Sequence, residues 1–144
     1  MRVLIALLAS VALPTSLSAD LKKAMAENNL EKRSRLALQN AEQALKAARK
    51  AYESGDLKQT QAKAEEILAS VELAEESLRQ TGKDPRRKPK HFKHAEKETR
   101  ELLREIESLE NYMSYTDRPV MQKLKERTHE IHDDLLAGIM GEKR

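Results

Sequence analysis

The sequence predicts an all-α fold, an up-down antiparallel four-helix bundle made of two long helical hairpins. Apolar residues recur at alternating steps of three and four in four separate stretches, which is the period of bundle helices. No stretch shows the two-residue alternation that a strand needs. Two short turns and one proline-containing linker separate the stretches, and short connections join antiparallel neighbours.

The first hairpin is expected over residues 30–81. Its helices meet at the sequence ESGDL, where Gly55 ends one helix and Asp56 caps the next. Residues 20–29 precede it as a polar lead-in that has the composition for a helix. The expected seam residues are Leu38, Ala41, Leu45, Ala48 and Tyr52 in the first helix, and Leu57, Ala64, Ile67 or Leu68, Val71, Ala74 and Leu78 in the second.

The second hairpin is expected over residues 91–140, after a basic linker at 82–90. Its turn is YTDRP, in which Thr116 or Asp117 caps the last helix and Pro119 lies in the first turn. Residues 30–144 would thus form a single helical domain. The expected seam residues are Phe92, Ala95, Thr99, Leu102, Ile106, Leu109 and Met113 in one helix, and Met121, Leu124, Thr128, Ile131, Leu135 and Ile139 in the other.

The first 19 residues are typical of a secretory signal peptide. A positive start at Arg2 is followed by an apolar run from Val3 to Leu13, and then by Pro14 and small residues. This run is too short to span a bilayer, which takes about 20 residues. We expect cleavage after Ala19, with cleavage after Ser18 as the alternative. We further expect an exported protein, periplasmic or secreted, with no transmembrane segment after processing. The alternative interpretation is an amphipathic or buried first helix.

Composition excludes several classes of exported protein. The chain contains no cysteine, which rules out a lipid-anchored lipoprotein and a scaffold held together by disulfides. There are 27 lysines and arginines against 24 aspartates and glutamates, so the chain is almost neutral. Its three tyrosines, single phenylalanine and lack of tryptophan leave the core to aliphatic residues and alanine.

The distribution of charge along the chain is more informative than its net charge. In an up-down bundle the start of the first helix, the linker and the C-terminus meet at one end, which would be strongly basic. Such an end can bind anionic lipid, an acidic envelope polymer or an acidic protein face. Export and the lack of an interleaved aromatic platform on which bases could stack argue against nucleic acid. The alternative interpretation is a solvated connector. The candidate binding residues are Lys83, Arg86, Arg87, Lys88, Lys90 and Lys93.

Four histidines form two pairs with i, i+3 spacing, His91 with His94 and His129 with His132. Imidazole pairs can bind Zn²⁺, Cu²⁺ or Ni²⁺. The heptad frame places all four outside the core, and His94 and His132 about 10 Å apart along the bundle axis. Metal binding or buffering is therefore an alternative to surface histidines without a special role, and no cofactor is expected.

No catalytic pattern is present. The sequence contains no Gly-x-Ser-x-Gly, no glycine-rich phosphate loop and no cysteine nucleophile. Only Glu126 has a histidine three residues on, His129, whereas a di-iron bundle needs this Glu-x-x-His spacing on two helices. Most of the glutamates lie near lysine or arginine at helical spacing, as solvated faces do. We expect a protein that is not an enzyme.

Residues 44–68, ALKAARKAYESGDLKQTQAKAEEIL, resemble one helix-turn-helix unit of a tetratricopeptide-type repeat. The peptide-binding function of that repeat is not carried over, because the second hairpin does not repeat the spacing. The chain as a whole resembles uncharacterised secreted bacterial proteins made of helical hairpins, a resemblance that implies no activity. Three functions are expected in order: an interaction protein with a basic end, a metal-binding protein, and a self-associating coiled-coil protein.

Overall fold

The computed structural model describes residues 18–142. Within that range the fold is all-helical, as predicted, and contains no strand. The helices are α1 (Ala19–Ala26), α2 (Leu30–Glu53), α3 (Leu57–Gln80), α4 (Lys90–Tyr112) and α5 (Pro119–Met140). None of the helices in this part of the chain is long and apolar enough to cross a membrane. Most of the predicted signal peptide, residues 1–17, lies outside the described residues, as do Lys143 and Arg144.

The prediction of four helices is corrected by α1, which forms in the polar lead-in. Ser18 caps this helix, because its hydroxyl accepts a hydrogen bond from the Leu21 N–H at 3.1 Å. Leu21 and Ala24 are buried. Two apolar residues three apart make one narrow buried stripe, too short for a seam that can be recognised in the sequence.

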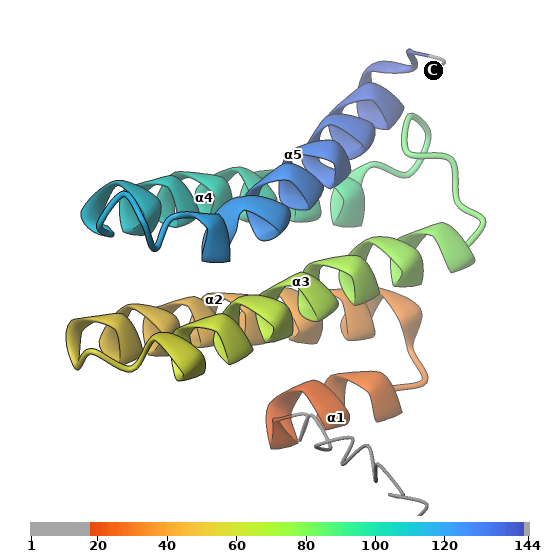
Figure 1. The fold of residues 1–144 in the computed structure, drawn as a ribbon. Helices are drawn as coiled ribbons and strands as arrows, with labels where there is room; N and C mark the ends of the chain where they lie inside the picture. The colour runs from red at the N-terminus through yellow and green to blue at the C-terminus, as the bar shows by residue number, and fades with distance from the viewer. Residues whose placement is uncertain (1–17, 143–144) are drawn as a thin grey trace, which may run out of the picture.

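The four longer helices form two hairpins that pack together, one from α2 and α3 and the other from α4 and α5 (Figure 1). Contacts between α3 and α5 and between α2 and α4 hold the hairpins to each other, and α1 packs on α2. The α2–α3 and α4–α5 turns lie at one end of the molecule. The α3–α4 linker lies at the other end, together with the C-terminus of α5 (Figure 1).

The core is formed by the predicted apolar seams of the helices, which face one another. Every expected seam residue of α4 is buried, and in α5 all but the half-buried Ile139 are buried. On α3, Ile67 is fully buried whereas Leu68 is half-buried, which settles that alternative. Leu57 is an exception because it starts α3 and remains exposed. These seams are buried within one chain, and self-association stays a prediction.

The α2–α3 turn has the predicted caps. Gly55 adopts a positive φ of 78°, and the Asp56 carboxylate accepts a hydrogen bond from the Gln59 N–H at 2.9 Å. The predicted cap of α5 by Thr116 or Asp117 is wrong. The N-cap residue is Arg118, which makes no capping hydrogen bond through its side chain, and Pro119 begins the helix.

Asp117 is engaged by the other hairpin instead. The Tyr52 hydroxyl, at the end of α2, donates to Asp117 Oδ2 at 2.9 Å. The same hydroxyl accepts a hydrogen bond from the Ser114 N–H, also at 2.9 Å. The Tyr112 ring lies edge-on to Tyr52 with ring centroids 6.0 Å apart. Tyr52 therefore fastens the α4–α5 turn to the first hairpin.

Candidate functional site

The basic linker is an ordered turn built around Asp84. The Asp84 carboxylate accepts a hydrogen bond from the Arg86 N–H at 2.9 Å. Its carbonyl accepts hydrogen bonds from the N–H groups of Arg87 and Lys88. Pro85 packs on α5, since a Cβ added at Gly138 would lie 3.3 Å from the Pro85 ring. The linker therefore presents its cations from a defined backbone rather than from a loose connector.

Lys83 and His91 share a carboxylate supplied by α2. Lys83 Nζ forms an ion pair with Glu31 Oε1, and His91 Nε2 lies 3.1 Å from Glu31 Oε2. The hydrogen bond from Lys83 is the main cause that lowers the pKa of Glu31 below its ordinary value. The charges of His91 and Lys88 act on this pKa in the same direction. The structure thus joins the start of α2 to the linker and to the first turn of α4.

Arg86 lies against the C-terminus of α5. Gly141 closes that helix with a positive φ of 74°, and a Cβ added there would come 2.5 Å from Arg86 Nε. A cation is favourable at this position because the last carbonyl groups of a helix carry a partial negative charge. The start of α2, the linker and the end of α5 therefore meet at one end. We call the six cations at this end the basic end: Lys83, Arg86, Arg87, Lys88, Lys90 and Lys93.

The remaining cations of the basic end are exposed. The Arg87 side chain is 87% exposed and its nearest carboxylate, that of Asp84, is 3.8 Å away. Lys88, Lys90 and Lys93 are exposed and form no ion pair with any residue between 18 and 142. Two of the six candidate residues, Lys83 and Arg86, are thus engaged by the fold, and the others face solvent.

The N-terminus of α4 adds to the positive potential. Its N-cap residue is Pro89, which provides no side-chain hydrogen bond, and its first turn contains no acidic residue. The first N–H groups of a helix carry a partial positive charge, which acidic residues usually offset. Here Lys90 and Lys93 stand there instead. This arrangement costs some helix stability and favours a nearby anion.

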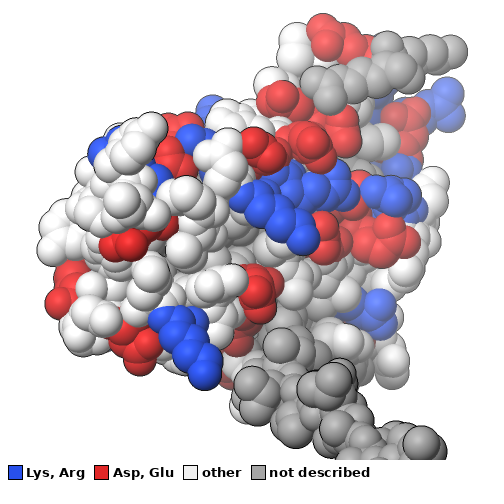
Figure 2. Space-filling view, in the orientation of Figure 1, with Lys and Arg blue, Asp and Glu red and all other residues white. Residues whose placement is uncertain are grey.

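The charges on the α3 and α5 faces are arranged differently. Figure 2 shows cations and acids side by side over these helices. Arg127 on α5 lies 3.3 Å from Glu72 on α3 and 2.9 Å from Glu130. Arg79 on α3 pairs with two acids of its own helix. These cations are already matched by acids, so they are poorer receptors for an external anion than the exposed lysines of the basic end.

Three of the four histidines contact separate carboxylates. His91 contacts Glu31, His129 Nε2 lies 3.5 Å from Glu107, and His132 Nε2 lies 3.1 Å from Glu96. His94 is exposed. Residues 18–142 hold no group of three or more histidines and acids arranged for a metal ion. The metal hypothesis therefore stays a prediction from spacing alone.

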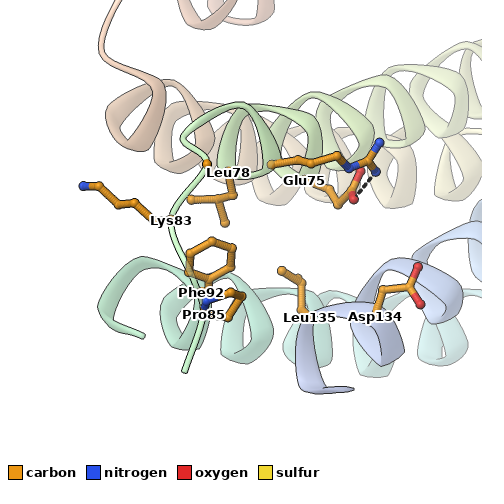
Figure 3. A pocket seen from close by; sticks show the side chains of 9 residues that line it. Glu75, Leu78, Lys83, Pro85, Phe92, Asp134 and Leu135 are labelled. Atoms are coloured by element: carbon orange, nitrogen blue, oxygen red, sulfur yellow. Dashed lines mark hydrogen bonds and ion pairs between the residues drawn. The ribbon is translucent and has the colours of Figure 1, made fainter. Parts of the chain in front are cut away.

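A cleft of about 310 Å³ lies beside the linker. Figure 3 shows Leu78, Phe92 and Leu135 directed into one apolar space, with Glu75 and Asp134 toward its edge. Arg79 and Lys83 complete the rim, which therefore carries two cations and two acids. The charges of the rim do not select a ligand of either sign. This volume is at the lower limit of ligand pockets, about 300 Å³.

Comparisons of this chain with protein-family models, with curated proteins and with solved structures give no match.

Proposed function

We propose that this chain is an exported, non-enzymatic helical protein whose basic end binds anionic components of the cell envelope. The observation that carries the proposal is the set of exposed, unpaired lysines at positions 88, 90 and 93. They lie on the ordered linker turn and on the first turn of α4, beside Arg86 and Arg87. Cations that have no intramolecular partner and are fixed near one another attract anions more strongly than charges that are already paired.

Apolar side chains at the same end favour a phosphate-bearing lipid surface over an acidic protein face. Met140, in the last turn of α5, is 62% exposed and precedes Gly141, which contacts Arg86. Leu136 is exposed one turn earlier on the same helix. Basic residues beside exposed apolar ones are typical of surfaces that bind at the headgroup level of a membrane. An acidic protein face is the alternative partner.

Export is part of the proposal and is supported by the apolar run at Val3–Leu13 and by the small residues that end at Ala19. Outside the cytoplasm the available anions include lipid headgroups and acidic polymers. Processing can be measured directly, because mass spectrometry of the protein recovered from outside the cytoplasm should give a chain that begins at Asp20.

Sedimentation with lipid vesicles tests the binding function. We expect residues 20–144 to bind vesicles of equal parts phosphatidylglycerol and phosphatidylcholine, and to be released as salt rises through about 0.1 to 0.5 M, where the Debye length shrinks. Reversal of Arg86, Arg87 and Lys88 to glutamate should abolish binding. Vesicles of phosphatidylcholine alone should not bind.

The matched control reverses Lys50, Lys58 and Lys123, which are exposed near the opposite end of the molecule and change the net charge equally. This variant should retain much more binding than the linker variant. Equal loss in the two variants would mean that net charge alone acts. Binding to polyglutamate but not to anionic vesicles would identify the acidic protein face as the partner.

A further inference from the structure

The basic end already contains one bound anion, the Glu31 carboxylate. It is supplied by the first turn of α2, whereas its partners come from the linker and from α4. Lys83 pairs with one carboxylate oxygen, and His91 Nε2 lies 3.1 Å from the other. The contact between Lys83 and Glu31 joins residues 52 positions apart, so it is a feature of the tertiary fold.

The surroundings of Glu31 are those of an anion-binding site. Lys83 and His91 each contact one of its oxygens, and the charge of Lys88 also lowers the pKa of this carboxyl. An external oxyanion that approaches the linker would therefore meet Glu31 between Lys83 and His91. Neither of these two groups can give its full attraction to a ligand while Glu31 stays in place.

We propose that Glu31 is an internal competitor at the basic end, and that the phosphate oxygens of an anionic lipid replace its carboxylate between Lys83 and His91. This inference rests on the proposed function and assigns its regulation. Binding to the lipid surface and release of Glu31 then occur as one exchange. The affinity of the protein for the lipid is set by how much more strongly the lipid phosphate binds between Lys83 and His91 than the Glu31 carboxylate does.

The exchange is feasible because the displaced groups lie close to water. The Glu31 side chain is 21% exposed and that of Lys83 is 39% exposed. Ion pairs of this kind contribute little net stability, so a surface with many phosphates can outcompete one carboxylate. After displacement, Glu31 remains in the first turn of α2, where a negative charge interacts favourably with the helix dipole.

The test compares Glu31→Gln with the matched control Glu27→Gln in the same vesicle assay. Glu27 lies near the same end, its side chain is 23% exposed, and it pairs with Lys32 on α2 instead of with the linker. Both variants remove one negative charge and release one lysine. We expect Glu31→Gln to bind roughly two- to fivefold more tightly than Glu27→Gln, a gain of the size that loss of one exposed ion pair permits.

A second measurement uses the unmodified protein and so does not depend on the folding of a variant. Inorganic pyrophosphate is titrated while the Glu31 side-chain carboxyl carbon and the linker amides are followed by NMR. Displacement requires that the Glu31 resonance and the amide resonances of residues 86–91 change together and saturate at the same concentration.

The outcomes separate the inference from the function on which it rests. Salt-sensitive binding by the wild-type protein, with equal affinities for Glu31→Gln and Glu27→Gln, overturns the inference and leaves the function standing. A Glu31 resonance that stays fixed while the linker amides move overturns it as well. If wild-type protein and both variants all fail to bind vesicles, the function fails and the inference fails with it.

Discussion

Two threonines in the seams of α4 and α5 show how one hydrogen bond changes the contribution of a residue to the stability of the fold. Thr99 on α4 and Thr128 on α5 are both almost completely buried. The Thr99 hydroxyl donates to the Ala95 carbonyl at 2.8 Å. The Thr128 hydroxyl finds no partner among residues 18–142. A buried hydroxyl without a hydrogen bond keeps its desolvation cost and gains nothing in return.

Thr128→Val should therefore stabilise the protein by about 1 kcal/mol, because a methyl group of similar size replaces the unpaired hydroxyl. Thr99→Val is the matched control and should be neutral or destabilising, since it removes a hydroxyl that is satisfied. The free energy of unfolding is measured in urea. An unchanged dependence of this free energy on urea concentration would show that the surface exposed on unfolding is the same in each variant. A loss of stability in Thr128→Val would mean that its hydroxyl is hydrogen-bonded in solution.

At the scale of the elements, the two hairpins are joined by apolar seams along their length and by one tyrosine at the turn end. Tyr52 donates to Asp117 and accepts from the Ser114 N–H, both in the other hairpin. Neither contact involves a neighbour in sequence. The α4–α5 turn is consequently shaped by α2 and not only by its own residues.

Tyr52→Phe should destabilise the protein by about 1 to 2 kcal/mol, because Asp117 and the Ser114 N–H lose a partner while the ring contacts stay. Tyr112→Phe is the control. Its side chain is 58% exposed and its hydroxyl forms no hydrogen bond within residues 18–142, so the change should be close to neutral. Thermal unfolding of the two variants gives the comparison. Similar midpoints would show that the Tyr52 hydroxyl contributes no net stability.

The elements that could be predicted are those whose signal is periodic and local. The α4 seam, from Phe92 to Met113, is buried as predicted because seven apolar or small residues repeat at heptad spacing. The helix α1 has only Leu21 and Ala24 to bury, and so lacks such a signal. The predicted cap of α5 was wrong because Asp117 meets Tyr52, a contact between residues 65 positions apart that no local pattern records.

At the scale of the whole molecule, a nearly neutral chain places exposed, unpaired lysines close together at one end, at positions 88, 90 and 93. The six candidate residues could be nominated from the sequence, because they lie close together along the chain. The sequence could not separate Lys83, which Glu31 engages, and Arg86, which lies on α5, from the exposed lysines. That distinction depends on which helix termini meet the linker, and hence on the packing of the hairpins.

The Glu31 contacts also predict how stability depends on pH. Because the folded-state pKa of Glu31 is lowered, chiefly by Lys83, its stabilisation is present above the unfolded value of about 4.3 and is lost as pH falls through the folded-state pKa. Glu31→Gln should therefore be less stable than wild type near pH 6, and the difference should shrink toward pH 3.

The control for this titration is Glu101→Gln, at an exposed position on α4 that forms no ion pair with the described residues. Urea unfolding at each pH gives both differences. A Glu31→Gln difference that stays constant with pH would show that the charge of this carboxylate does not tie the linker to α2.

The cap of α1 has a consequence for maturation. Ser18 holds the first turn of α1 through the Leu21 N–H, and its hydroxyl lies 3.4 Å from Asn40 Oδ1 on α2. Proteolysis after Ala19 would remove this serine together with the leader and leave a new ammonium group on Asp20, at the end of the helix where positive charge is unfavourable. The precursor and the processed protein would then differ in how firmly α1 is docked, although their remaining sequences are the same.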